Sequence, residues 1–218
     1  MSEIQFRDAR GAELADGCAL LARSLAFAER DALPPWLVQT SAAHGGLALG
    51  AFDGSSLVGF SFALPGEPST LFSCGLAVAP GVRGRGVGRR LKQLQRDRAR
   101  AAGVRLIRWT ADPLSVPALA LYLGRLRARL VAYAPALYAA VRPGAADDVV
   151  IEWPLVEGPA LGSPSARVEI PLDRDAGDRC RGEVRRAMTD ALAAGGVGVD
   201  VTVDRAAGRA WVLFREGA

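Results

Sequence analysis

Residues 71–88 read LFSCGLAVAPGVRGRGVG, a short apolar run followed by a proline and a turn rich in glycine and arginine. The apolar part, residues 71–78, has the length and composition of a strand. Residues 89–102 contain good helix formers and no proline, and Val87, Leu91 and Leu94 fall on one helical face. A glycine-rich turn that enters a helix presents free backbone N–H groups at the positive end of the helix dipole. The stretch therefore predicts a strand, an anion-binding turn and a helix.

Two common phosphate-binding patterns do not fit this turn. The dinucleotide fingerprint G-x-G-x-x-G needs a third glycine where this chain has Arg89, and the only lysine, Lys92, comes too late for a P-loop. The turn does match R-x-x-G-x-G preceded by Val-x-Pro, and the matching residues are Val78, Pro80, Arg83, Gly86 and Gly88. This pattern resembles the acyl-CoA pyrophosphate loop of the GNAT N-acetyltransferases. The alternative interpretation is an arginine-rich turn without a ligand.

Composition limits the class of protein. The chain has 218 residues, half of them hydrophobic, which suits one large domain or one and a half, with a proper core. Its formal net charge is +4, and ten basic residues lie between Arg83 and Arg108. Such a run is also compatible with nucleic-acid binding. Because no aromatic residues are interleaved with it, we favour a phosphate-facing loop and a solvated helix face, with no nucleic-acid partner.

The cysteines and the N-terminal residues indicate the cellular compartment of the protein. Cys18, Cys74 and Cys180 are odd in number and widely spaced, which predicts reduced thiols and no metal site. The N-terminus lacks the pattern of a signal peptide, and no apolar stretch is long enough to span a membrane. We therefore expect a cytoplasmic protein without membrane contact.

Hydrophobic periodicity and turn residues predict the remaining elements. Strands are expected at residues 3–8, 47–52, 57–64, 71–78, 105–110, 129–133 and 149–155. Helices are expected at residues 12–30, 36–43, 89–102 and 115–126. Residues 157–165 are the best linker candidate, and after them we expect a strand (167–172), a helix (178–194) and a hairpin (197–203 and 210–215).

This order of elements resembles the GNAT fold, and a second motif supports the resemblance. Residues 118–122, ALALY, match the A-x-x-L-Y of a later helix in that family. Two departures accompany the match: Ser115 stands where asparagine is usual, and Arg127 stands where a following Gly-Phe would begin. The resemblance implies an α/β fold of the acyl-CoA N-acyltransferase type, with a mixed central sheet flanked by helices.

A narrower resemblance covers most of the chain. Residues 109–114, 151–153 and 169–171 look like a bacterial branch of predicted GNAT acetyltransferases with a C-terminal extension. Asp147-Asp148 here replaces an expected Asp-Arg, so an arginine that would hold an acidic substrate is absent from this position. We expect a GNAT domain at residues 1–156 and an extension at 157–218, packed on the core or at a homodimer interface.

The resemblance implies a cofactor and a set of residues that bind it. The cofactor is acetyl-CoA, and the candidate residues are Leu76, Ala77, Val78, Arg83, Gly84, Arg85, Gly86, Val87, Gly88 and Arg89. Backbone amides near Val78 would stabilise the oxyanion while a small-molecule or peptide amine attacks the thioester directly.

The candidate catalytic residues are Tyr122 and Asp112. Tyr122 would protonate the departing thiolate; the alternative is a core aromatic on an amphipathic helix. Asp112 follows a strand and would act as a base or bind an ammonium group, but an Asp-Pro turn starter is the favoured interpretation. The resemblance also implies a glutamate on the central strand as the general base, but residues 71–78 contain none.

Four other side chains are candidate bases or candidate groups that orient the acceptor. Cys74 is the titratable residue on the central strand, and a buried cysteine is usually inert. Glu29 and Asp31 lie on a helix connection, where a solvated loop is the simpler interpretation. His44, the sole histidine, sits in a glycine turn and is favoured as a structural residue. Deprotonation through water needs none of them.

Three function classes follow from these patterns. The first is an N-acetyltransferase that uses acetyl-CoA. The second is a GNAT-fold protein that binds acyl-CoA without transfer, as a sensor or an interaction module, which the missing glutamate favours. The third is a nucleic-acid-binding protein that uses the arginine run, which a salt-dependence measurement would detect.

Overall fold

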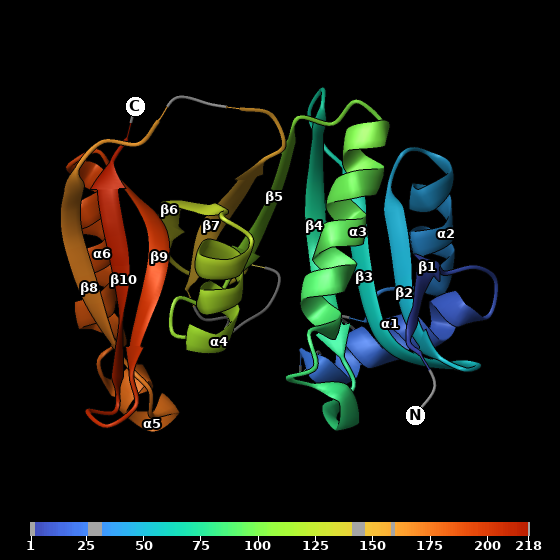
Figure 1. Ribbon diagram of the computed structural model, residues 1–218, viewed down its shortest axis with the longest axis horizontal. Helices are drawn as coiled ribbons and strands as arrows, with labels where there is room; N and C mark the ends of the chain where they lie inside the picture. Colours follow the sequence, from blue (N-terminus) through green and yellow to red (C-terminus); the bar gives the residue numbers. More distant parts are fainter. Residues whose placement is uncertain (1–2, 26–31, 141–146, 158–159, 218) are drawn as a thin grey trace. The chain divides into compact units, whose positions relative to one another are not determined.

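The computed structural model describes residues 3–25, 32–140, 147–157 and 160–217 (Figure 1). The chain divides into two units, residues 1–107 and residues 108–218, and each is described by itself. Helices flank a mostly antiparallel sheet, so the predicted α/β class is confirmed. The predicted domain boundary after residue 156 stays a prediction.

The N-terminal unit contains four antiparallel strands in the order β1-β2-β3-β4. Its strands are β1 (Gln5–Asp8), β2 (Leu47–Asp53), β3 (Ser56–Pro65) and β4 (Thr70–Val78). Its helices are α1 (Glu13–Ser24), α2 (Pro35–Ala43), the short 3₁₀ turn η2 (Pro80–Val82) and α3 (Val87–Ala101). The predicted strands and helices here are present, with ends shifted by a few residues.

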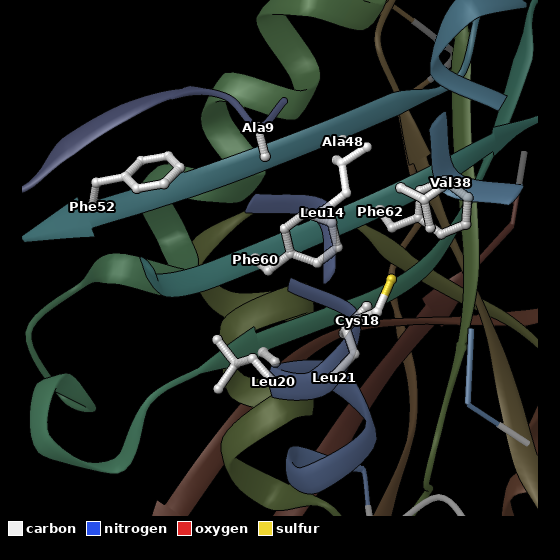
Figure 2. Close-up of a cluster of buried hydrophobic side chains, with 11 residues drawn as sticks. Ala9, Leu14, Cys18, Leu20, Leu21, Val38, Ala48, Phe52, Phe60 and Phe62 are labelled. Carbon is white, nitrogen blue, oxygen red and sulfur yellow. The ribbon is translucent and has the colours of Figure 1, made fainter. Parts of the chain in front are cut away.

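Both faces of this four-stranded sheet are covered by helices. Helices α1 and α2 pack on one face, where Leu14, Cys18 and Leu21 of α1 meet Phe60 and Phe62 of β3 (Figure 2). Helix α3 covers the other face and buries its Val87 and Leu91. Burying a leucine or phenylalanine side chain contributes about 1.5–3 kcal/mol, so the two layers hold α3 firmly against the sheet.

The C-terminal unit is also built on strands, in the order β5-β7-β6-β9-β10-β8. The strands are β5 (Leu106–Ala111), β6 (Arg129–Ala134), β7 (Asp148–Pro154), β8 (Pro164–Pro171), β9 (Gly196–Asp204) and β10 (Arg209–Glu216). The helices are α4 (Val116–Leu119), the π-helix η3 (Ala120–Arg125), α5 (Arg174–Arg179) and α6 (Arg181–Ala193). Strand β9 pairs with β6 through Gly198 and Leu130, so the C-terminal segment continues the same sheet.

Three predicted helices differ from those observed. The predicted helix at residues 115–126 is a short α-helix followed by π-helical η3, in which Leu126 N donates to Leu121 O. The helix predicted at 178–194 is two helices, α5 and α6, separated at Cys180 between Gly177 and Gly182, which disfavour helix. The helix predicted at 12–30 ends at Ser24, and residues 26–31 lie outside the described part.

An ion pair between an exposed arginine of α6 and a buried carboxylate joins Arg185 to Asp147, the residue before β7. The Asp147 side chain is 3% exposed and accepts hydrogen bonds from Arg185 Nε and Nη2, both at 2.8 Å. It also accepts from Tyr133 Oη at 2.8 Å and Ala136 N at 3.1 Å. Burial alone would raise the pKa of Asp147, but the hydrogen bonds from Tyr133 and Arg185 outweigh it and hold the pKa below its usual range.

Replacing Arg185 by methionine should destabilise the chain by about 2 kcal/mol or more, because a buried carboxylate loses its bidentate partner. Because the pKa of Asp147 is lowered on folding, its contribution is present at neutral pH and lost as the pH falls through that pKa. The loss in free energy of unfolding caused by Arg185→Met should therefore be smaller at acidic pH. Urea unfolding at neutral and acidic pH measures this, with the exposed neighbour Arg186→Met as control. Equal stabilities of the two variants at neutral pH would refute the role given to this ion pair.

No helix within the described ranges has the length and apolar character needed to cross a membrane.

Candidate functional site

The turn between β4 and α3 has a fixed backbone shape. After Val78 the chain forms the 3₁₀ turn η2, and Arg83 Nε then donates a hydrogen bond to Val78 O at 3.0 Å. Gly84 and Gly86 have φ of +76° and +81°, in the left-handed region that residues with a Cβ adopt only at a cost. The two glycines therefore let the chain turn sharply into the helix.

Helix α3 begins at Val87, two residues before the predicted start, with Gly86 as its N-cap. Arg90 N donates to Gly86 O, so the N–H groups of Val87, Gly88 and Arg89 precede the helical ladder. A Cβ added at Gly84 or Gly86 would find no atom within 4 Å, so the space beside this turn is open. Backbone donors thus face an open space at the positive end of a 15-residue helix.

The charged side chains around the same helix end are all basic. The first turn of α3 contains no acidic residue, whereas Arg89 and Arg90 lie in it and Arg83 and Arg85 precede it. Cations near a helix N-terminus are unfavourable, by about 0.3–1 kcal/mol each at the surface. The Arg90 guanidinium is placed over the Phe6 ring, 4.4 Å from its centroid. A bound anion would relieve this concentration of positive charge.

Strand β4 carries a bulge shortly before this turn. Ser73 pairs with Ala63 and Gly75 pairs with Phe62, which leaves Cys74 as the extra residue. The Cys74 thiol donates to Phe72 O at 3.5 Å, and burial raises its pKa to about 11. The thiol is therefore protonated at neutral pH, which fits the interpretation of Cys74 as inert packing.

A buried polar cluster under α3 was not predicted from the sequence. Lys92 is 1% exposed, and its Nζ donates to Ser73 Oγ at 2.8 Å and to Gln95 Oε1 at 3.1 Å. The Gln95 amide donates in turn to Ser61 Oγ and Ser73 Oγ, each at 3.2 Å. Burial lowers the pKa of Lys92 to about 7. Lys92 lies three residues before Gln95 and seven before Ala99, on one helical face, but its charge gave no signal that this face is buried.

The lowered pKa of Lys92 should make stability depend on pH. In the unfolded chain lysine titrates near pH 10.4, so between about pH 7 and 10 the unfolded state binds more protons than the folded state. The free energy of unfolding should therefore rise by about 1.4 kcal/mol from about pH 6 to pH 8. The buried thiols have the opposite effect, but only at higher pH, where they lose their protons in the unfolded chain. Urea unfolding measures this rise, which Lys92→Met should abolish and the exposed Arg100→Met should keep. A rise unchanged in Lys92→Met would rule out this source of the pH dependence.

Tyr122 lies in the π-helix η3 of the C-terminal unit. Its ring contacts Trp109 edge to face with centroids 5.0 Å apart, and Trp109 contacts Trp153 in the same way at 6.3 Å. Burial raises the pKa of Tyr122 to about 12, so the phenol keeps its proton at neutral pH. A π-helix is uncommon and is frequent at functional sites. The residue is therefore held rigidly in a proton-bearing state, as a hydrogen-bond donor requires.

The Asp112 carboxylate has partners on two sides. Its Oδ1 accepts a hydrogen bond from Leu114 N at 3.0 Å and faces Arg181 Nη1 of α6 at 3.3 Å. The first contact is the turn-starting bond expected of an Asp-Pro sequence. The second ties β5 to the C-terminal segment. A catalytic role for Asp112 stays a prediction.

The other predicted residues fall at separate places. His44 is exposed at the end of α2, with Nδ1 2.8 Å from Thr40 O. Glu29 and Asp31 lie outside the described residues. Arg127 has φ of +60°, a conformation that favours glycine, at the place where a Gly-Phe pair was expected. The candidate cofactor residues 83–89 belong to the N-terminal unit, and Tyr122 and Asp112 belong to the C-terminal unit.

Comparison with known proteins identifies the family. The model of the acetyltransferase (GNAT) family matches residues 17–125, half of the chain, which includes the turn, α3 and Tyr122. The chain belongs to the GNAT acetyltransferase family. No curated protein matches its sequence.

Solved structures of this family share the fold. The ribosomal-protein-S18-alanine N-acetyltransferase from Escherichia coli is 16% identical, with a TM-score of 0.60 over 72% of this chain and 97% of that chain. An IAA acetyltransferase from Bacillus cereus is 21% identical, with a TM-score of 0.53 over 70% and 98%. A GNAT acetyltransferase from Elizabethkingia anophelis with acetyl-CoA bound is 15% identical, with a TM-score of 0.54 over 70% and 97%.

Proposed function

We propose that this chain transfers an acetyl group from acetyl-CoA to an amine acceptor, by direct attack of the amine on the thioester. The main support is the start of α3, where three backbone N–H groups precede the helical ladder beside the open space at Gly84 and Gly86, and where the first turn contains no acidic residue. A pyrophosphate is the part of acetyl-CoA that such a site recognises. The acetyl-CoA bound in the Elizabethkingia structure, which has the same fold, supports this cofactor.

Different groups of the chain would bind different parts of acetyl-CoA. The amides of Val87, Gly88 and Arg89 would hold the pyrophosphate, since they precede the helical ladder. Arg83 and Arg85 would add charge, and the hydrogen bond from Arg83 to Val78 O keeps the turn in shape. Backbone groups of residues 76–78 would lie along the acyl end and donate to the carbonyl oxygen as it becomes negative.

The leaving thiolate would be stabilised by Tyr122. A thiol has a pKa near 8.5, well below that of the buried phenol at about 12, so complete proton transfer to the thiolate is uphill. A phenol hydrogen bond that strengthens as charge develops on sulfur is therefore the effective contribution. The amine proton would leave through water, because Cys74 holds its own proton and Asp112 is paired with Arg181.

Replacing Gly86 by glutamate should weaken acetyl-CoA binding at least tenfold, about 1.4 kcal/mol. The new carboxylate would stand at the helix N-terminus and repel the pyrophosphate. Because φ at Gly86 is +81°, any side chain also strains the turn, so Gly86→Gln is the matched control. Calorimetric titration of acetyl-CoA measures both variants, and Gly86→Glu should bind more weakly than Gly86→Gln. A folded Gly86→Glu protein with unchanged affinity would reject the assignment of this turn.

A second candidate function is acyl-CoA binding without transfer, as a sensor or interaction module. The absence of any carboxylate on β4 and the pairing of Asp112 favour it. Release of free thiol from acetyl-CoA in the presence of a panel of amines, with the acetylated amine identified by mass spectrometry, separates the two functions. Amine-dependent release supports the transferase, and acetyl-CoA binding without release for any amine supports the sensor.

A further inference from the structure

A groove opens in the C-terminal unit where the turn into β6 faces the strands β9, β10 and β8. It has a volume of about 980 Å³. Its walls are built from residues 127–129, residues 160–161 and 164–167, and parts of β9 and β10. Strands β6 and β9 pair only at Leu130 and Gly198, and residues 127–129 then line the groove with Val199 and Asp200 of β9.

The charged side chains of the groove are nearly all of one sign. Arg127, Arg129, Arg167 and Arg215 line it, with Asp200 as the one acidic residue. Asp200 Oδ1 already accepts a hydrogen bond from Val201 N at 2.8 Å. Among the described residues, Arg127, Arg167 and Arg215 take part in no ion pair. The groove therefore holds three guanidinium groups that no carboxylate of the described residues pairs with.

One of these arginines is held in place by an aromatic ring. The Arg167 guanidinium lies 5.4 Å from the centroid of the Trp211 ring, and both residues are on neighbouring strands, β8 and β10. Stacking of this kind reduces the freedom of the side chain before a ligand arrives. A planar guanidinium that is already oriented is well suited to a carboxylate or phosphate group.

The rest of the lining is mostly apolar. Between the arginines lie Leu161, Pro164, Val199, Leu213 and Phe214. A groove of this volume accommodates a molecule of small-ligand size. Its composition matches a ligand with an anionic group and an apolar body, since neither an inorganic ion nor a neutral hydrocarbon would use both kinds of surface.

The backbone at Arg127 adds an independent observation. Its φ of +60° is strained for a residue with a Cβ, and glycine would avoid this strain. The chain nevertheless places an exposed arginine there, at the rim of the groove. Strained residues of this kind are frequent at ligand sites.

We propose that this groove is a binding site for a small amphipathic anion, one that carries a carboxylate or a phosphate group on an apolar body. The guanidinium groups of Arg127, Arg167 and Arg215 bind the anionic group, and Leu161, Val199 and Leu213 contact the apolar part. The site belongs to the C-terminal unit alone, and it does not depend on the acetyltransferase function.

The test uses the full chain, saturated with acetyl-CoA, and follows backbone amide resonances while probes are added. Octanoate and octyl phosphate are the anionic probes, and octylamine and inorganic phosphate are the controls. Both anionic probes should shift the amides of Arg129, Val199 and Asp200, and the tighter one identifies the preferred head group. Neither control should shift them at the same concentrations.

Variants separate binding from folding. The double variant Arg167→Gln/Arg215→Gln should bind the tighter of the two anionic probes at least tenfold more weakly than the wild type. Arg205→Gln, in the exposed hairpin turn outside the groove, should keep the wild-type affinity. Arg127→Gly should weaken binding of the probe. The Tm of this variant should equal or exceed that of the wild type, because glycine relieves the backbone strain at this position. The proposal is overturned if octylamine or inorganic phosphate shifts the same amides equally, or if the double variant binds the probe with unchanged affinity.

Discussion

Replacing Tyr122 by phenylalanine should lower the turnover rate about a hundredfold or more and leave acetyl-CoA affinity nearly unchanged. The change removes one oxygen and keeps the ring that packs against Trp109 at 5.0 Å. The phenol hydrogen bond matters only as charge builds on the thiolate, so the loss should fall on kcat. The measurement is kcat and acetyl-CoA affinity for both proteins, with any amine that the wild type accepts.

Two comparisons make the Tyr122 result specific. Tyr133, which donates to Asp147, is the matched control, since Tyr133→Phe removes the same atom and should lower stability while keeping kcat. Thermal melting should show Tyr122→Phe close to wild type. Equal turnover in Tyr122→Phe and wild type would remove Tyr122 from the mechanism and leave the thiolate to solvent or backbone amides.

Deleting the chain after Gly158 should yield insoluble or molten protein. The deletion removes β8, α5, α6, β9 and β10, and with them the packing of β9 and α6 against β6. It would expose Leu130 of β6, which is now fully buried, and remove Arg185, the cationic partner of the Asp147 carboxylate. Each buried leucine side chain contributes about 1.5–3 kcal/mol, whereas the whole stability of a domain is only about 5–15 kcal/mol.

The deletion is checked by near-ultraviolet circular dichroism and urea unfolding, with a chain that ends at Glu216 as the control. The control keeps every strand and should unfold cooperatively. A protein truncated after Gly158 that stays soluble, melts cooperatively and binds acetyl-CoA fully would show that residues 159–218 form a separate module.

The turn before α3 was the part of the site most accessible to sequence reasoning. Glycines at positions 84 and 86 mark left-handed backbone, which local sterics determine, and the arginines beside them are visible without any fold. Alternating and helical periodicity likewise predicted the sheet and α1 to α3, because buried faces impose those periods. The start of α3 lies two residues earlier than predicted, because Gly86 caps the helix and Val87 already belongs to it.

The features that could not be predicted from the sequence depend on tertiary contacts and on backbone hydrogen bonds. Lys92 looked like one more cation on a solvated helix, and only the packing of α3 on β3 and β4 buries it beside Ser73. The pair of Asp147 with Arg185 joins residues 38 positions apart, which no local pattern records. The π-helix at Tyr122 depends on backbone hydrogen bonds rather than on composition, since ALALYLGR is compatible with an ordinary α-helix.

A crystal structure of the chain with CoA would show whether the start of α3 binds the pyrophosphate. We expect pyrophosphate oxygens at about 2.7–3.2 Å from the amide nitrogens of Val87, Gly88 and Arg89, with the thiol within reach of the Tyr122 hydroxyl. CoA bound elsewhere, with its pyrophosphate away from the start of α3, would contradict it.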